Sequence, residues 1–399
     1  MPERAVVVDL AAVRHNVRAL RERLRHPDGA SHPGGTSLPD RTGPELMAVV
    51  KADAYGHGAI PVARAALDAG ADRLGVAHVT EALALREAGV QAPVLAWLHT
   101  AGTDFAAAVA AEVALGVSGW ELEHVAEAAR TVGRPALVHV KADTGLGRNG
   151  ATAQTLPAVA RRAAELEAAG LVRVEGLFSH LGVADELDRA AETDAQREAF
   201  AAAEATLRAA GLTPRVRHLA NTPATLTRPD LHLDMVRVGL GLYGLSPFPG
   251  RSPESLGLRP AMSLRTTLAN VKHVPAGQGV SYGFRYRTER PTRLGLVPLG
   301  YADGVPRIAD GAPVEVAGRR LRVAGRIAMD QFVVDLGPEA TEQVGDPVEL
   351  FGPASGISAD AWAEAAGTIN YELVTRLGAR VPRLHVDSET SATSGKDHP

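Results

Sequence analysis

The stretch MAVVKADAYGHG, residues 47–58, runs from an apolar segment straight into a lysine and then into small and polar residues. Its first four residues have the composition of a strand that is buried on both faces. Lys51 follows directly, although an ammonium group is costly to remove from water. A strand that ends on such a residue is typical of an α/β barrel, where functional side chains stand at the carboxyl ends of the strands.

This run is one of eight, and Ala-rich segments of helical period separate most of them. The eight runs are LMAVVK (46–51), RLGVAH (73–78), PVLAWL (93–98), EVALGVS (112–118), ALVHVKA (136–142), VRVEGLFS (172–179), RVRHLA (215–220) and LDMVRVG (233–239). The alternation predicts an α/β fold, a (β/α)8 TIM-like barrel, in preference to a doubly wound sheet.

The pattern changes after residue 250. The segment 245–260 is rich in Pro, Gly and Ser, which is typical of a linker between domains. Strand-like segments without intervening helices follow it, so we expect a mostly antiparallel β domain over 251–385. The barrel then occupies 1–250 and includes a flexible loop at 26–44, and residues 386–399 form a disordered tail.

The composition is that of an ordinary soluble chain of 399 residues, with a net charge of −4 and no cysteine. This charge predicts neither nucleic acid nor an anionic membrane as a partner. No apolar run approaches the roughly 20 residues that span a bilayer, and the N-terminus lacks the apolar core of a signal peptide. The lack of cysteine excludes disulfides and thiolate metal sites, and we expect a cytoplasmic protein without a bound metal.

Polar side chains gather at the predicted carboxyl ends of the barrel strands. They are Lys51, Lys141, His180, Asn221 with Thr222, and Arg237 with Gly239. Each alone has an ordinary explanation, since a strand-end lysine is more often solvent-exposed and a lone histidine is often a satisfied core residue. Together they predict one site, because a barrel brings all its strand ends to the same mouth.

Lys51 is the candidate nucleophile of this site. A desolvated lysine has a lowered pKa and can form a Schiff base with an aldehyde, and pyridoxal phosphate (PLP) is the common aldehyde cofactor held in this way. Barrels usually bind phosphate with the loops after strands seven and eight. Here those loops carry Asn221-Thr222 and Gly239-Leu240, whose hydroxyl, amide and backbone N–H groups suit a phosphate.

A second motif competes with this interpretation. Gly145, Gly147 and Gly150 form a G-x-G-x-x-G pattern between a strand and a helix, and the acidic Glu175 follows. On pattern alone this passes for a dinucleotide fingerprint. Arg148 fills the turn, however, and the match falls in the fifth unit of an eight-unit array. Glycines that serve only a tight turn explain the pattern better.

The motifs together resemble those of the bacterial alanine racemases, a PLP-dependent family of the fold type III barrel class. The resemblance runs from Val8 to about Pro382. AVVKADAYGHG is similar to the family's cofactor motif, which implies Lys51 as the Schiff-base lysine and Tyr55 as a phosphate contact. VKADTGLGR implies that Lys141 is carbamylated and that Arg148 contacts the substrate carboxylate. FSHL, HLANTPA, VRVGLGLYG and TINYE imply further cofactor contacts: His180, Asn221, Thr222, Arg237, Gly239, Leu240 and Tyr371.

The second domain carries motifs of the same family. VSYGFRY implies Tyr282 as a second catalytic base. GYADG and GRIAMDQ imply Tyr301, Met329 and Asp330 as substrate contacts. In the family the β domain of one subunit covers the barrel mouth of the other, so the resemblance implies a homodimer with shared active sites.

The resemblance implies a two-base interconversion of L-alanine and D-alanine that supplies D-alanine for peptidoglycan. Lys51 and Tyr282 would exchange the Cα proton on opposite faces of the cofactor. Arg237 would hydrogen-bond the pyridine nitrogen, and because arginine keeps its proton, that nitrogen would stay unprotonated and transamination would be limited.

Three alternatives remain open at this point. The first is a serine or broader-specificity racemase, which would differ in pocket shape. The second is another fold type III PLP enzyme, such as a decarboxylase. Such an enzyme would usually place a carboxylate at the pyridine nitrogen and a cysteine at the second site, whereas this chain offers Arg237 and no cysteine. The third is a PLP-binding regulator, which would need no second base at Tyr282.

Overall fold

The computed structural model describes residues 3–25 and 43–388, so most of the predicted loop at 26–44 and of the predicted tail at 386–399 lies outside the described residues. Eight parallel strands form one sheet in the order β8-β7-β6-β5-β4-β3-β2-β9. They are β2 (Glu45–Val49), β3 (Arg73–Val76), β4 (Val94–Ala96), β5 (Val113–Val117), β6 (Ala136–Lys141), β7 (Val172–Phe178), β8 (Val216–His218) and β9 (Met235–Val238). These are the eight runs expected from the sequence.

The two end strands of this sheet meet and close the barrel. The Arg237 N–H donates to the Ala220 carbonyl over 3.0 Å, and the Asp234 N–H donates to the Arg217 carbonyl over 3.2 Å. Closure leaves no free strand edge and brings every strand end to one mouth. The predicted (β/α)8 barrel is confirmed.

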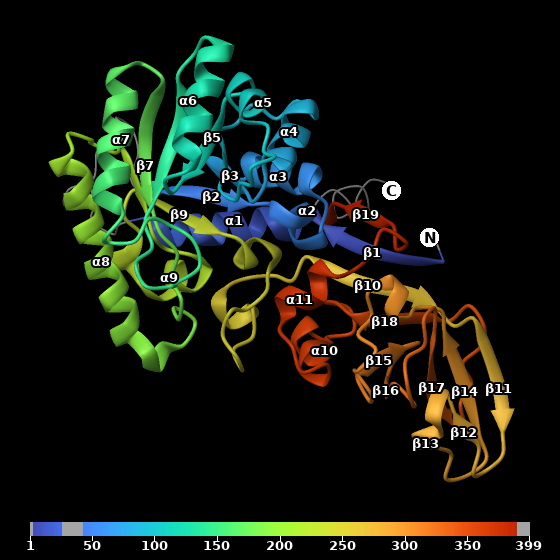
Figure 1. The fold of residues 1–399 in the computed structure, drawn as a ribbon. Helices are drawn as coiled ribbons and strands as arrows, with labels where there is room; N and C mark the ends of the chain where they lie inside the picture. The colour runs from blue at the N-terminus through green and yellow to red at the C-terminus, as the bar shows by residue number, and fades with distance from the viewer. Residues whose placement is uncertain (1–2, 26–42, 389–399) are drawn as a thin grey trace, which may run out of the picture.

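Ala-rich helices surround the strands (Figure 1). Their apolar faces are buried, as the helical period of the sequence requires. The α-helices of this part are α1 (Leu10–Leu24), α2 (Lys51–Gly56), α3 (Ala59–Asp68), α4 (Val79–Glu87), α5 (Phe105–Ala110), α6 (Glu121–Val132), α7 (Leu156–Ala168), α8 (Ala190–Ala209) and α9 (Thr222–Thr227). The 3-10 turns are η1 (Leu187–Arg189), η2 (Pro229–Leu231), η3 (Leu240–Tyr243) and η4 (Glu254–Leu256).

The later part of the chain is mostly antiparallel, as the sequence predicts, and it extends to one side of the barrel (Figure 1). Its strands are β10 (Met262–Thr267), β11 (Asn270–Val274), β12 (Gly279–Val280), β13 (Tyr286–Arg287), β14 (Thr292–Val297), β15 (Pro313–Val316), β16 (Arg319–Arg322), β17 (Phe332–Gly337), β18 (Pro347–Phe351) and β19 (Arg383–Val386). The turns η5 (Tyr282–Phe284) and η6 (Tyr301–Asp303) and the helices α10 (Ala359–Ala365) and α11 (Asn370–Thr375) complete it.

One strand from the start of the chain joins this later part. Strand β1 (Arg4–Asp9) lies between β10 and β19 in a six-stranded sheet, antiparallel to the first and parallel to the second. The sequence analysis did not single out this strand. Strand β1 thus precedes the barrel in the chain but belongs to the sheet of the β domain. The domain limits at 250 and 385 stay a prediction.

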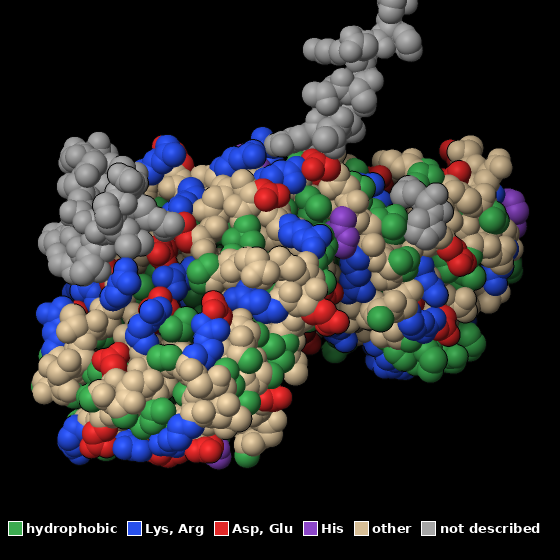
Figure 2. All heavy atoms as spheres, turned by 90° about the horizontal axis from the view of Figure 1, so that it is seen from above, with side chains coloured by type: hydrophobic (Ala, Val, Ile, Leu, Met, Phe, Trp, Pro, Cys, Tyr) green, Lys and Arg blue, Asp and Glu red, His purple; other side chains and the backbone are tan. Residues whose placement is uncertain are grey.

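The surface of the described residues is mixed in charge. Figure 2 shows Lys and Arg side chains interspersed with Asp and Glu over the face seen from above. Among the described residues, no helix combines the length and the apolar character that crossing a bilayer requires.

Candidate active site

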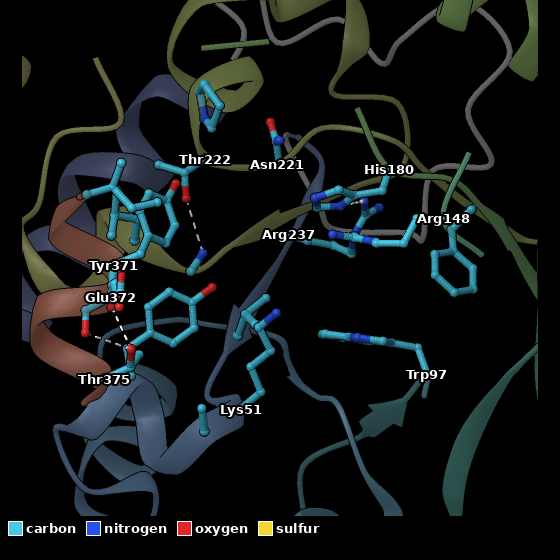
Figure 3. A pocket seen from close by; sticks show the side chains of 18 of the residues that line it. Lys51, Trp97, Arg148, His180, Asn221, Thr222, Arg237, Tyr371, Glu372 and Thr375 are labelled. Atoms are coloured by element: carbon cyan, nitrogen blue, oxygen red, sulfur yellow. Dashed lines mark hydrogen bonds between the residues drawn. The ribbon is translucent and has the colours of Figure 1, made fainter. Parts of the chain in front are cut away.

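A pocket of about 630 Å³ opens at the mouth of the barrel. It is lined by Val49, Lys51, Ala52, Tyr55, Trp97, Lys141, Arg148, Phe178, His180, Asn221, Thr222, Pro223, Arg237, Gly239, Leu240, Ile369, Tyr371, Glu372 and Thr375. Every barrel residue that the sequence analysis placed in the site is among them. Figure 3 shows Lys51 on one wall, Arg237 and His180 across from it, Thr222 and Tyr371 at one end, and Trp97 and Arg148 at the other.

The backbone after Lys51 is a left-handed helical turn. Ala52, Asp53, Ala54 and Tyr55 all have φ between 52° and 54° and ψ between 41° and 50°. For residues with a Cβ this conformation costs roughly 1–2 kcal/mol each, and it is rare for it to continue over several residues. The turn brings both Lys51 and Tyr55 to the pocket within five residues.

Glu81, in the first turn of α4, holds this turn in place. Its Oε1 accepts the Ala52 N–H at 2.6 Å, and its Oε2 accepts the N–H groups of Ala77 and His78 at 2.9 and 3.0 Å. One carboxylate therefore ties the start of the left-handed turn to the neighbouring β3–α4 loop. Asp53 secures the far end, since its side chain accepts the Ala59 N–H at 2.8 Å.

The two pocket lysines are partly desolvated and stand among other cations. Burial lowers the pKa of Lys51, and the positive charge of Arg148 lowers it further. Burial, followed by the charges of Arg237 and Arg148, lowers the pKa of Lys141 to about 8. The Lys141 Nζ lies 5.5 Å from the ring centre of Phe178, a favourable cation–π distance. Both amines therefore lose their proton more readily than a lysine in water.

One end of the pocket is a small polar cradle. The Thr222 hydroxyl accepts the N–H groups of Gly239 and Gly241 at 3.2 and 3.4 Å. Gly239 lies against the Tyr55 hydroxyl, and a Cβ at this glycine would stand only 2.4 Å from that oxygen. Burial raises the pKa of Tyr55 to about 12, so its hydroxyl remains a donor at neutral pH. The cradle offers the hydroxyl protons of Tyr55 and Thr222 to an anion such as a phosphate.

Arg237 is buried within the opposite wall of the pocket. Its guanidinium donates to the carbonyls of Ser179, His218 and Leu219 at 2.6, 2.8 and 3.1 Å. It also faces the Nδ1 atom of His180 at 3.4 Å. Desolvation lowers the pKa of Arg237 to about 9, so the group stays charged at neutral pH. Burial and the surrounding cations, Arg237 first, hold the pKa of His180 well below its ordinary value, which keeps this imidazole neutral.

The glycine-rich loop after β6 presents Arg148 to the pocket. The Asp143 carboxylate accepts the N–H groups of Gly145 and Gly147 at 3.0 and 3.1 Å, which closes a compact turn. Gly150 approaches the backbone so closely that a Cβ there would stand 2.5 Å from the Asp143 nitrogen. The glycines serve this turn, and the helix that follows begins only at Leu156. The dinucleotide interpretation of the pattern is therefore not needed.

Of the candidates in the second domain, Tyr371 lines this pocket, whereas Tyr282, Tyr301, Met329 and Asp330 do not. Tyr282 lies in η5 and is 69% exposed, and Met329 and Tyr301 are 53% and 38% exposed. Asp330 forms an ion pair with Arg380 at 2.8 Å. The structure thus collects the barrel candidates and Tyr371 at one cavity and leaves the other four second-domain candidates on the surface of the same chain.

Several lining residues escaped the sequence analysis. Trp97 and Phe178 contribute aromatic walls, and Ile369, Glu372 and Thr375 come from α11 and the residue before it. Trp97 follows β4 directly, so its place at a strand end was a usable signal. Ile369 and Glu372 lie with Tyr371 in the TINYE motif, so this motif was a usable signal for both. Thr375 had no such signal, because only the folded chain brings α11 next to α2.

The fold and the site define a class of lysine-dependent barrel enzymes. Its features are a closed barrel and, at the barrel mouth, a desolvated lysine, an anion cradle and a buried arginine. Comparison with known proteins narrows this class to one family. Two family models match the chain: "Alanine racemase, N-terminal domain" over residues 36–247 and "Alanine racemase, C-terminal domain" over residues 261–385. The chain belongs to the alanine racemase family, a family of isomerases.

Individual relatives agree with the family models. The chain is 52% identical over 385 residues to an alanine racemase from Frankia casuarinae, and the match covers 95% of each sequence. It is 50% identical over 382 residues to an alanine racemase from Thermobifida fusca, covering 95% of this chain and 96% of that one. An alanine racemase crystal structure from Streptomyces lavendulae superposes with a TM-score of 0.91 at 49% identity, covering 97% and 98% of the two chains.

Glu81→Ala should disturb the left-handed turn. The substitution removes the acceptor of three backbone N–H groups, and we expect a loss of roughly 1–2 kcal/mol in the free energy of unfolding. Faster amide exchange should concentrate at residues 51–56 and 77–78. Urea unfolding and hydrogen exchange measure the two effects. Glu87→Ala, at an exposed position of the same helix, is the control and should change neither. Unchanged exchange in the turn would show that Glu81 does not hold it.

Proposed function

We propose that this chain is a PLP-dependent alanine racemase that interconverts L- and D-alanine by a two-base mechanism and supplies D-alanine for peptidoglycan in the cytoplasm. The observation that carries the proposal is the pairing of a desolvated lysine with an anion cradle across one pocket. Lys51 suits an aldehyde, and Tyr55, Thr222 and Gly239 suit a phosphate. The pocket residues therefore fit PLP, which carries both groups.

The other pocket residues have roles that follow from their placement. Asn221 and Tyr371 line the same end of the pocket as Thr222 (Figure 3), and Leu240, which follows Gly239 in the chain, also lines the pocket. When bound, PLP would supply an electron-withdrawing ring that makes the Cα proton of the substrate amino acid acidic. Lys51, once its amine is free and neutral, takes or returns that proton on its own side. Arg148 carries a positive charge suited to the substrate carboxylate.

Arg237 and His180 supply hydrogen-bond donors on the wall across from Lys51. Among the described residues, no protein acceptor is recorded for the Nε–H of Arg237, whereas its terminal nitrogens are taken by carbonyls. The Nε–H is therefore the donor available to the pyridine nitrogen. His180 accepts from Arg237 through Nδ1, so its proton lies on Nε2 and is available to a second base.

We propose that this second base is Tyr282 of a partner subunit in a homodimer. Tyr282, Met329 and Tyr301 are exposed in the single chain, and Phe284 and Ile308 beside them in the chain are 58% and 72% exposed. Contiguous patches of exposed apolar side chains mark surfaces that bind another protein, and we infer that these side chains contribute to such a patch. Tyr282 stands on a strained turn with positive φ at Ser281 and Phe284, which is typical of a functional site. Asp330 and Met329 would then contact substrate from the same partner.

A racemase of serine or of broader specificity is the alternative within this proposal. It uses the same Lys51 and Tyr282, so the alternatives differ only in the substrate side chain that the pocket accepts. Assays with L-alanine and L-serine side by side distinguish them.

PLP should be bound to Lys51. We expect visible absorbance from the purified protein that shifts on borohydride reduction, with the pyridoxyl adduct on the peptide containing residues 51–56 and D-alanine formed from L-alanine by the unreduced enzyme. Peptide mass mapping and a D-alanine assay measure this. Lys272→Ala, in the exposed part of β11, is the control and should leave both unchanged. An adduct on another lysine would overturn the assignment.

Tyr282 should act on the partner's site. Lys51→Ala and Tyr282→Phe homodimers should each be nearly inactive, because each lacks one proton-transfer group at both sites. In a mixed dimer one site receives both lesions and the other receives neither, so co-refolding should restore about a quarter of the wild-type activity at equal mixing, by random assortment of subunits into a dimer with two sites. If Tyr282 acted within its own chain, every site would keep a lesion and no activity would return.

Lys141 should carry a carbamate that attracts Arg148. Its pKa of about 8 leaves more neutral amine at pH 7 than an ordinary lysine has, and the neutral amine is the form that adds CO2 with loss of a proton. At constant dissolved CO2 the modification should increase as the pH rises through about 8. Carbon-13 NMR with labelled CO2 measures it without acid. The Lys141→Gln variant should lack the signal, and a wild-type spectrum without it would contradict the proposal.

A further inference from the structure

A chain of polar side chains crosses the interior of the barrel below the pocket. The Arg237 Nη1 lies 3.2 Å from His218 Nδ1, and His218 Nε2 lies 2.9 Å from His139 Nδ1. His139 Nε2 lies 3.5 Å from the Glu175 carboxylate, which also faces Arg73 at 3.4 Å. Both histidines are fully buried. This relay therefore leads from the pocket wall to a carboxylate at the other end of the barrel.

The order of donors and acceptors in the relay is fixed by Arg237. A guanidinium has only donors, so His218 Nδ1 must accept, and the His218 proton must lie on Nε2. That N–H faces His139 Nδ1, which must therefore accept as well. The His139 proton then lies on Nε2 and faces the Glu175 carboxylate. Burial holds the pKa values of both imidazoles low, so each ring carries a single proton.

The backbone around the relay makes room for it. The pairing of β6 with β7 shifts register between Val138 and His139, where a bulge re-aims the side chain. Gly176 faces the His139 ring so closely that a Cβ would stand 2.1 Å from Nδ1. The Phe178 ring stacks on His218 at 4.9 Å with 8° between the planes. Three separate features of two strands thus fix the orientation of two imidazoles.

Arg237 needs such support because it is a buried cation. Among the described residues, its hydrogen-bond partners include no carboxylate. Carbonyls and imidazole nitrogens surround it instead. A buried charge is stabilised only when its neighbours are correctly oriented. We propose that Glu175 and His139 are positioning residues: they fix the His218 tautomer, and this tautomer holds Arg237 in the pose that the reaction uses. The expected effect of these residues on the reaction rate rests on the proposed PLP-dependent function. The assignment of the two histidine tautomers does not rest on it.

Glu175→Met tests the relay, because the thioether cannot accept the His139 proton. The His139 proton is then free to move to Nδ1, which forces the His218 proton onto Nδ1, where it faces the Arg237 donors. Long-range proton–nitrogen NMR of the cofactor-free protein with labelled histidine reads the tautomers directly. The wild type should show both rings protonated at Nε2, and the variant should show a mixture.

The loaded enzyme supplies the second measurement. We expect kcat of Glu175→Met to fall roughly tenfold, with KM changed less than twofold. The absorbance of the bound cofactor should shift, because the contact at its ring nitrogen changes. Glu175→Gln retains an acceptor oxygen and should keep the wild-type tautomers and most of kcat.

Glu204→Met is the matched control. Glu204 is 17% exposed and Glu175 is 14% exposed, and each pairs at 3.4 Å with an arginine of a barrel strand, Arg217 or Arg73. Only Glu175 contacts a histidine of the relay, so the control should leave tautomers and kcat unchanged. A wild-type His139 or His218 protonated at Nδ1 would overturn the relay even in an active racemase. Conversely, a protein that lacks PLP and racemase activity but shows the expected tautomers would refute only the proposed function.

Discussion

The site depends on four cationic side chains that face one cavity. Lys51, Lys141, Arg148 and Arg237 all line it, and Glu372 is the one carboxylate among the described lining residues. Desolvation and mutual repulsion both disfavour this arrangement, and they act together to lower the pKa values of the two lysines. Carbonyl oxygens and the face of Phe178 offset part of the cost. An anionic ligand with a phosphate would offset more of this cost. The positive charge of the pocket therefore favours the binding of such an anion, and it also favours the neutral, reactive form of the two lysine amines.

The barrel meets this constraint by giving each cation a different neighbour. Arg237 is enclosed by carbonyls and stays charged, because a guanidinium tolerates desolvation better than an ammonium does. Lys51 is held by a left-handed turn whose strain is offset by the hydrogen bonds of Glu81. Arg148 stands on a loop closed by Asp143. At the end of each of these strands, the local backbone conformation and its hydrogen bonds thus position one cationic side chain.

The sequence predicts the features that have a short-range signal. The eight strands and the residues at their ends follow from apolar runs and from the polar residue that closes each run. The left-handed turn does not follow, because Ala52 and Ala54 favour a right-handed helix, and the contacts of Glu81 and Asp53 that hold the turn form only in the folded chain. Strand β1 escapes because Arg4 pairs with Thr266, far along the chain. The relay escapes because His139 and Glu175 read as ordinary strand residues until closure places them in one interior.

Strand β1 also bears on how two distant bases could share a substrate. It leads directly into α1 on the barrel, and Asp9, its last residue, caps that helix by accepting the Ala11 N–H. On both sides it is hydrogen-bonded to strands of the β domain. The two parts of the chain are thus joined by a sheet as well as by the segment 245–260. Proton transfer requires placement within a fraction of an ångström, which a flexible linker alone does not provide. If Tyr282 serves the barrel of a neighbouring subunit, as we propose, then the β domain must be held in place relative to its own barrel, and the pairing of β1 with strands on both sides contributes to this.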